Sequence, residues 1–241
     1  MNQEMFMVDM DLLESLSKNA KKNIKGGNLM KPKIYYIMDI MCGWCYSFSD
    51  VITKVYEEYK GKVDFTIVPA GMWINKDIKK MTKEFNDYIK KNNIKVTQLS
   101  GKEFGEAYYL MLHNTNTVLN SLPGSKAINL VNTLKNQASF EYLKALQKQF
   151  FINGKNMNDI EVYSKTAEDF GIDSAIFKKQ FSSKKLTDET FKQFKFASEL
   201  KVSSYPSLVL SSNGKLSFIS SGYLTYDEVK SRIEKSLGLL C

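Results

Sequence analysis

The stretch Cys42-Gly43-Trp44-Cys45 places two cysteines one helical turn apart, shortly after the apolar run Ile34-Tyr35-Tyr36-Ile37-Met38. A run of that length and composition is typical of a buried strand. After it, apolar residues recur at helical spacing at Trp44, Phe48, Val51, Ile52, Val55 and Tyr59. The sequence therefore predicts a strand, the cysteine pair and a helix in direct succession.

The predicted position at a helix N-terminus favours a reactive cysteine pair. Unpaired N–H groups and a partial positive charge at a helix N-terminus favour thiolate over thiol, and the thiolate is the nucleophile of disulfide exchange. Cys45, one turn after Cys42, is close enough to form a disulfide with it. A Cys-x-x-Cys at a strand–helix junction is typical of a dithiol redox catalyst.

Three other roles for the pair have less support. A structural zinc site needs four nitrogen or sulfur ligands, and the chain offers only Cys42, Cys45, Cys241 and His113, with no second half-site. A purely structural disulfide across so short a loop would constrain little of the unfolded chain. Two incidental core cysteines would not explain the strand–helix context. We therefore expect no metal, and we expect Cys241 to be an incidental thiol.

The composition argues against several classes of protein. The 241 residues are 43% hydrophobic, enough for one large domain or two small ones. No apolar run approaches the roughly 20 residues that span a bilayer. The net charge of +8 comes almost wholly from lysine interleaved with acidic residues, and Arg232 is the only arginine. Because nucleic-acid binders favour arginine, this charge indicates a solvated surface and no nucleic-acid partner.

Residues 1–29 differ in composition from the rest of the chain. Their apolar residues are too sparse for a secretory signal. Residues 16–27, which end in Gly26-Gly27, resemble a double-glycine leader, a segment that directs exported peptides to transporters that cleave after the second glycine. Lys21 departs from that pattern, because it stands where an apolar residue is usual. The alternative is a flexible tail that ends in a glycine hinge.

Periodicity and capping residues predict the order of the elements. Strands are expected at 33–39, 63–68, 208–210 and 216–219, with an Asn213-Gly214 hairpin turn between the last two. We expect Ser125, Asp173, Thr187 and Thr225 to cap four of the helices. Helices are expected at 46–60, 77–91, 102–112, 125–134, 139–150, 159–170, 173–181, 187–200 and 225–237.

The resulting order is β-α-β, then a helical block, then β-β-α. It is the order of an α/β thioredoxin fold with an inserted all-helical domain. The predicted segments are an N-terminal extension at 1–29, the first half of the thioredoxin fold at 30–74, the inserted helical domain at 75–186 and the second half of the fold at 187–241.

Pro206 directly precedes the third strand. In a thioredoxin fold the proline at this position follows a cis peptide bond and faces the cysteine pair; such bonds are uncommon and usually mark a functional turn. This turn would leave the Tyr205 backbone free to pair with an extended substrate beside Cys42. The alternative is an ordinary trans proline at the start of a strand.

The stretch Ile37-Met38-Asp39-Ile40-Met41-Cys42-Gly43-Trp44-Cys45-Tyr46-Ser47-Phe48 resembles the active site of DsbA-like thiol oxidoreductases of the FrnE type. These are related to 2-hydroxychromene-2-carboxylate isomerase and kappa-class glutathione transferase. The resemblance covers about residues 31–238 and implies that Cys42 is the nucleophile, Cys45 the resolving thiol and Pro206 the cis proline, under an inserted helical lid. The isomerase and transferase branches generally have serine in place of Cys42 and bind glutathione, so two thiols favour dithiol–disulfide exchange.

The activity predicted from the motif and the resemblance is thiol–disulfide exchange with cysteine-containing protein substrates, which Tyr205 and Trp44 would contact. No cofactor is expected beyond the redox-active Cys42–Cys45 disulfide, which glutathione or a redox partner protein would recycle. One alternative is a glutathione-dependent isomerase or transferase acting on a small organic substrate, and another is a binding module without catalysis. The resemblance implies a cytoplasmic protein, whereas cleavage of the leader at Gly27 would imply export.

The other aromatic residues and the single histidine receive no catalytic role. We expect His113 to be a polar residue near the end of a helix. A further set of aromatic residues lies at helical spacing and is expected to belong to the core: Trp73, Phe85, Tyr88, Tyr108 and Tyr109.

Overall fold

A four-stranded sheet in the order β2-β1-β5-β6 forms the centre of the fold. The computed structural model describes residues 31–239, so the expectations for residues 1–29 and for Cys241 lie outside the described residues. The strands are β1 (Lys33–Met38), β2 (Asp64–Pro69), β5 (Ser207–Ser212) and β6 (Lys215–Ser221). β1 pairs in parallel with β2 and antiparallel with β5, which pairs antiparallel with β6. The cysteine pair follows the C-terminal end of the central strand β1.

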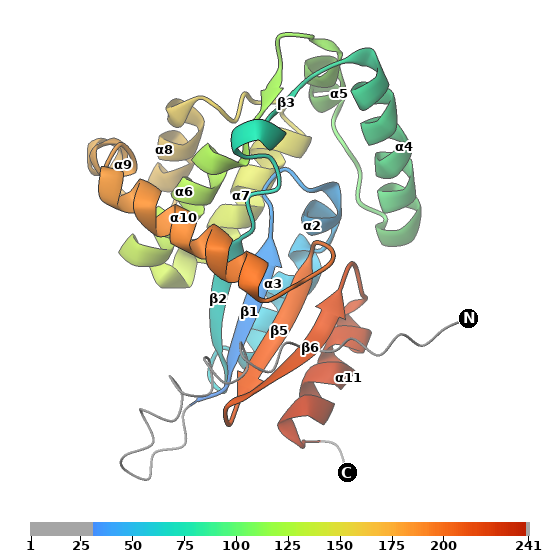
Figure 1. Cartoon of the computed structure of the whole chain (residues 1–241), viewed down its shortest axis with the longest axis vertical. Helices are drawn as coiled ribbons and strands as arrows, with labels where there is room; N and C mark the ends of the chain where they lie inside the picture. The colour runs from blue at the N-terminus through green and yellow to red at the C-terminus, as the bar shows by residue number, and fades with distance from the viewer. Residues whose placement is uncertain (1–30, 240–241) are drawn as a thin grey trace.

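Helices cover both faces of this sheet (Figure 1). α2 (Gly43–Ser47) and α3 (Ser49–Tyr59) follow β1, and α3 packs beside the C-terminal α11 (Tyr226–Leu237). α10 (Lys184–Glu199) crosses the opposite face and contacts β2. Sequence periodicity predicts one helix over 46–60. Phe48 divides it in the structure, although the backbone there stays helical, with φ of −81° and ψ of −8°.

Between β2 and β5 the chain forms a helical block beyond the C-terminal end of β1 (Figure 1). The block has the predicted place in the order of elements, but its small second sheet, β3 with β4, is not predicted. Its elements are the 3₁₀ turns Asn75–Asp77 and Asn136–Ala138, the strands β3 (Lys79–Lys80) and β4 (Val118–Leu119), and the helices α4 (Lys83–Ser100), α5 (Glu106–His113), α6 (Ser121–Leu134), α7 (Ser139–Phe151), α8 (Ile160–Glu168) and α9 (Ser174–Phe181).

Several predicted element ends are confirmed. Thr225 and Glu228 form the capping box of α11, because each side chain accepts a hydrogen bond from the other residue's backbone N–H. Asn213 and Gly214 turn the β5–β6 hairpin, with φ of 52° and 75°. Both values lie in the left-handed region that this turn requires, which is why Asn-Gly is such a strong hairpin signal. Asp173 caps α9 by accepting from the Ile176 N–H.

The predicted caps Ser125 and Thr187 are wrong. Asn120 caps α6 instead, by accepting from the Leu122 N–H at 3.0 Å, and the Ser125 hydroxyl donates to a carbonyl inside the helix. Likewise Ser183 caps α10, and the Thr187 hydroxyl donates to the Ser183 carbonyl. In both helices a capping residue a few positions earlier satisfies the free N–H groups of the first turn.

The predicted helix 77–91 is also displaced, since α4 runs over Lys83–Ser100. Thr82 caps this helix by accepting from the Phe85 N–H at 3.1 Å. The residues before it cannot join the helix because Lys79 and Lys80 pair with β4. This pairing of residues distant in sequence leaves no local periodic signal.

One hydrophobic cluster joins the sheet to the helical block. Its completely buried side chains include Tyr36 of β1 and Phe151 of α7, and the cluster also contains Cys42 and Cys45. The cysteine pair therefore lies where the sheet meets the block. Of the helices within residues 31–239, none is long and apolar enough to cross a membrane.

Candidate active site

Cys42 stands at the N-cap position of α2, where its backbone is held on both sides. Its N–H donates to the Asp39 carbonyl at 3.2 Å, and its carbonyl accepts from the Tyr46 N–H at 3.0 Å. Cys42 is 8% exposed, whereas Cys45 is completely buried. No disulfide joins the two thiols in this structure. Cys42 is therefore the thiol that an approaching substrate meets first.

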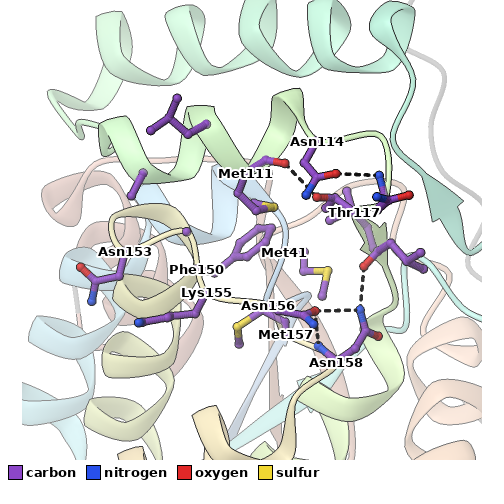
Figure 2. Close-up of a pocket in the computed structure, with 16 residues that line it drawn as sticks. Met41, Met111, Asn114, Thr117, Phe150, Asn153, Lys155, Asn156, Met157 and Asn158 are labelled. Carbon is purple, nitrogen blue, oxygen red and sulfur yellow. Dashed lines mark hydrogen bonds between the residues drawn. The ribbon is translucent and has the colours of Figure 1, made fainter.

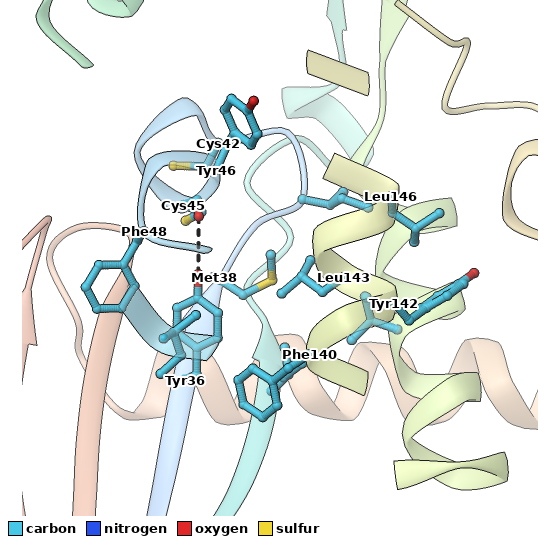
Figure 3. Packing of buried hydrophobic residues seen from close by; sticks show 14 of the residues in the cluster. Tyr36, Met38, Cys42, Cys45, Tyr46, Phe48, Phe140, Tyr142, Leu143 and Leu146 are labelled. Carbon is cyan, nitrogen blue, oxygen red and sulfur yellow. Dashed lines mark hydrogen bonds between the residues drawn. The ribbon is translucent and has the colours of Figure 1, made fainter. Parts of the chain in front are cut away.

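Cys45 lies inside the core formed by β1, α2 and α7 (Figure 3). Its carbonyl accepts from the Tyr36 hydroxyl at 3.5 Å, and the rings of Phe48 and Phe140 lie beside that of Tyr36. Burial raises the pKa of Cys45 well above its ordinary value of 9.0, and a hydrogen bond with Cys42 raises it further. Cys45 therefore remains a protonated thiol at neutral pH.

Asp39 ties the loop before Cys42 to the loop after β2. Its carboxylate accepts from the Met41 N–H at 3.0 Å and from the Met72 N–H at 2.9 Å. Burial raises the pKa of Asp39, and these two hydrogen bonds together with one from Ser121 oppose the rise. No role is predicted for Asp39 from the sequence. The available signal is an acidic side chain at the end of an apolar strand, three positions before the motif.

The Tyr205–Pro206 turn lies against Cys42. The peptide bond between the two residues is cis. The Cys42 thiol donates to the Tyr205 carbonyl oxygen, with 3.8 Å between Sγ and oxygen. The Pro206 carbonyl accepts from the Gly222 N–H at 2.7 Å, which ties the turn to the end of β6. The fold thus brings together two residues that are 163 positions apart.

A cavity of about 350 Å³, the Cys42 cavity, opens beside Cys42 between α2 and α4. Trp44 belongs to its wall, and its ring centroid lies 6.3 Å from that of Tyr223. The core prediction holds for Tyr108, which is 2% exposed, and Trp73, Phe85 and Tyr109 pack against the core. Four of the aromatic residues predicted as core also line the cavity: Trp73, Phe85, Tyr88 and Tyr108. The core prediction is wrong for Tyr88, which is 60% exposed at the edge of α4.

The comparison with known protein families agrees with this fold. A family model described as Thioredoxin matches residues 35–229, which is most of the chain. The chain belongs to the thioredoxin family. The predicted fold class, a thioredoxin fold with an inserted helical block, is thereby confirmed.

Solved structures share the whole fold of this thioredoxin-family chain. A putative protein disulfide isomerase from Nitrosomonas europaea matches with a TM-score of 0.77 at 23% identity, over 88% of this chain and 100% of that one. The cytosolic disulfide reductase DsbM from Pseudomonas aeruginosa matches with 0.71 at 22% identity, over 86% and 99%. A 2-hydroxychromene-2-carboxylate isomerase matches with 0.56 at 16% identity, over 87% and 96%. These likenesses confirm the predicted DsbA-like relationship at the level of the fold. No curated protein sequence matches the chain.

A larger hollow of about 790 Å³ is also lined by Met41 in this thioredoxin-family chain (Figure 2). Met41, Leu119 and Phe150 line both this hollow and the Cys42 cavity. Amide side chains at its rim form hydrogen bonds to nearby backbone groups. For example, Asn158 Nδ2 donates to the Val118 carbonyl at 2.8 Å. The two cavities therefore adjoin, and the larger one extends to α5.

His113 lies on the surface at the end of α5 and lines neither cavity. Its Nε2 lies 2.8 Å from the Nζ of Lys90, in an exposed contact that involves neither cysteine. Within residues 31–239 no group of three or more His, Cys, Asp or Glu side chains could hold a metal ion.

The geometry predicts selective modification of the reduced protein. At pH 7, iodoacetamide should label Cys42 at least about tenfold faster than Cys45, because Cys45 is buried and its raised pKa keeps it protonated. Peptide mass mapping measures the two rates separately. In guanidinium chloride the two cysteines should react at similar rates. Faster labelling of Cys45 in the folded protein would contradict the assignment of Cys42 as the accessible nucleophile.

Proposed function

We propose that this chain is a thiol–disulfide oxidoreductase that exchanges disulfides with cysteine-containing protein substrates. The observation that carries the proposal is the arrangement of Cys42. Its sulfur contacts the Tyr205 carbonyl oxygen, opens onto an apolar cavity and lies one helical turn before a buried second thiol. This arrangement provides an accessible nucleophile, a place for substrate and a resolving group.

The proposed reaction has two exchange steps. The Cys42 thiolate attacks one sulfur of a substrate disulfide, forms a mixed disulfide and releases the other substrate sulfur as a thiolate, which takes up a proton. Cys45 then loses its proton and attacks Cys42 Sγ. This step forms the Cys42–Cys45 disulfide and releases the second substrate thiol. The substrate gains two electrons and the enzyme loses two, and in the reverse direction the same steps oxidise a substrate dithiol.

The backbone beside Cys42 suits a peptide substrate. The Tyr205 carbonyl faces the Cys42 sulfur, so the chain of an extended substrate would pass along this turn. Trp44 would pack on the substrate from the wall of the Cys42 cavity. Glutathione or a redox partner protein would recycle the cysteine pair, and a structure of the fold relative DsbM with bound glutathione supports glutathione in this role.

Replacing Cys45 by serine tests the two steps. This variant should accumulate a mixed disulfide between Cys42 and a protein substrate, because the first attack is retained while resolution is lost. Non-reducing electrophoresis detects the adduct, and peptide mass mapping locates the bond. The double variant Cys42→Ser/Cys45→Ser is the matched control and should trap nothing. Equal trapping by both would refute the role of Cys42.

A second candidate is a glutathione-dependent isomerase or transferase. The Cys42 cavity favours it, because about 350 Å³ bounded by aromatic side chains can hold a small organic substrate. Such an enzyme needs no resolving thiol. Cys45→Ala should therefore retain its full turnover, whereas an oxidoreductase of the proposed kind should lose turnover with protein disulfides.

A further inference from the structure

Asn93 places an unused hydrogen-bond donor in the wall of the Cys42 cavity. The residue lies on α4, is only 3% exposed and lines the cavity. Its Nδ2 atom is buried and has no hydrogen-bond partner within residues 31–239. An unpaired buried amide lowers the stability of the folded protein by about 1–3 kcal/mol. Such a group needs an explanation, and a hydrogen bond to a bound ligand would provide one.

The surroundings of Asn93 show that the amide lies beside the reacting groups. A Cβ atom built on Gly43 would lie 3.3 Å from Asn93 Oδ1, so α4 approaches closely to the residue that follows Cys42. Burial raises the pKa of the Tyr108 hydroxyl, the nearby Asn93 amide lowers it and Cys42 raises it, so this hydroxyl lies close to both residues, although its contact with Asn93 Nδ2 does not reach hydrogen-bond geometry. Gly43, which has no side chain, thus leaves room for the Asn93 amide beside the cysteine motif.

Two other asparagines of α4 provide a contrast. Asn92 also lines the cavity, but its Nδ2 donates to the Tyr88 carbonyl at 3.2 Å and is therefore occupied. Asn86 is buried and has an unpartnered Oδ1, but it does not line the cavity. Among these three residues only Asn93 combines burial, a free donor and a position beside Cys42.

We propose that Asn93 Nδ2 donates a hydrogen bond to the backbone carbonyl of the substrate cysteine whose sulfur bonds to Cys42. The inference rests on the proposed disulfide exchange and names the group by which the site recognises its substrate. A carbonyl two bonds from Cβ accompanies the sulfur of every cysteinyl peptide. The peptide can come from a protein chain or from glutathione, which share this chemistry.

A pair of model disulfides tests the inference in the Cys45→Ser background, where only the first attack is measured. The disulfide of N-acetylcysteine N-methylamide carries the cysteinyl carbonyl, whereas cystamine has the same disulfide and no oxygen acceptor. The readout is the ratio of their rate constants for forming a mixed disulfide with Cys42, followed by mass spectrometry. Asn93→Leu should lower this ratio about 3- to 10-fold, as expected for loss of one hydrogen bond.

Asn86→Leu is the matched control, because it removes a buried amide from the same helix outside the cavity and should leave the ratio unchanged. If Asn93→Leu fails to fold, Asn93→Ala replaces it with the same expected fall. An unchanged ratio in the Asn93 variant, or an equal fall in the Asn86 variant, would overturn the inference. If Cys45→Ser alone forms no adduct with either disulfide, the proposed function itself fails.

Two further substrates identify the source of the carbonyl. Rates for oxidised glutathione and for the disulfide of a five-residue peptide with a central cysteine are each divided by the cystamine rate. A 3- to 10-fold fall in Asn93→Leu for both substrates supports recognition of cysteinyl peptides in general. A fall for only one of the two substrates supports the inference and identifies that substrate as the source of the carbonyl. If neither ratio falls, the inference is overturned for natural substrates.

Discussion

Replacing Cys42 by serine should lower the rate of protein disulfide reduction by about a thousandfold or more. A serine hydroxyl is not ionised at neutral pH and does not attack a disulfide. Cys45 cannot replace Cys42, because it is completely buried and its raised pKa keeps it protonated. Losing the nucleophile of a covalent mechanism has effects of this size. The measurement is reduction of insulin disulfides with excess glutathione as the reductant, corrected for the reaction without enzyme.

Cys241→Ser is the control, because it also removes one thiol from the protein but leaves the Cys42–Cys45 pair intact. It should keep the rate of the unsubstituted protein. If Cys42→Ser retained more than about a tenth of the activity, the reaction would run through another group and the proposed mechanism would be wrong.

Replacing Phe151 by alanine should lower the free energy of unfolding by about 3–5 kcal/mol. Phe151 ends α7, is completely buried and stacks on Tyr46 with 4.6 Å between ring centroids. It also contacts Phe104 and Tyr108, at centroid distances of 5.6 Å and 5.3 Å. The truncation would leave a hole where α2 meets the helical block. Urea denaturation of the reduced protein measures the loss.

Phe218→Ala is the matched control, because the same truncation is made at a side chain that is 45% exposed on β6. It should cost less than about 1 kcal/mol. The Phe151 variant should also label faster at Cys45, because Tyr46 is the next residue and loses its packing partner. A cost for Phe151→Ala no larger than that of the control would contradict the account of this core.

The sequence predicts well those features whose signal is local. The cysteine motif follows an apolar strand, and the structure places it at the end of β1. The Thr225 capping box and the Asn213-Gly214 turn depend on neighbouring residues, and both are found. Because such signals depend on only a few adjacent residues, contacts made elsewhere in the chain do not change them.

Features that depend on distant contacts are predicted less well. The start of α4 depends on the pairing of Lys79 with Leu119, which no periodicity reveals. Tyr88 has helical spacing but is 60% exposed and lines a cavity, because spacing along one helix does not show which of its faces another element covers. The sequence gives only a weak indication of a role for Asn93. It lies on the buried face of α4 with Asn86, Ile89 and Val96, where a polar side chain is unusual.

A redox titration of the purified protein tests the central claim that Cys42 and Cys45 cycle as one dithiol–disulfide couple. The protein is equilibrated in glutathione buffers from fully reduced to fully oxidised, quenched with acid and mapped by mass spectrometry. If the two thiols form one couple, the titration should show a single transition with the slope of a two-electron couple, and the oxidised product should be the Cys42–Cys45 disulfide. A pair that stays reduced throughout, or that ends only as a mixed disulfide of Cys42 with glutathione, would contradict the account.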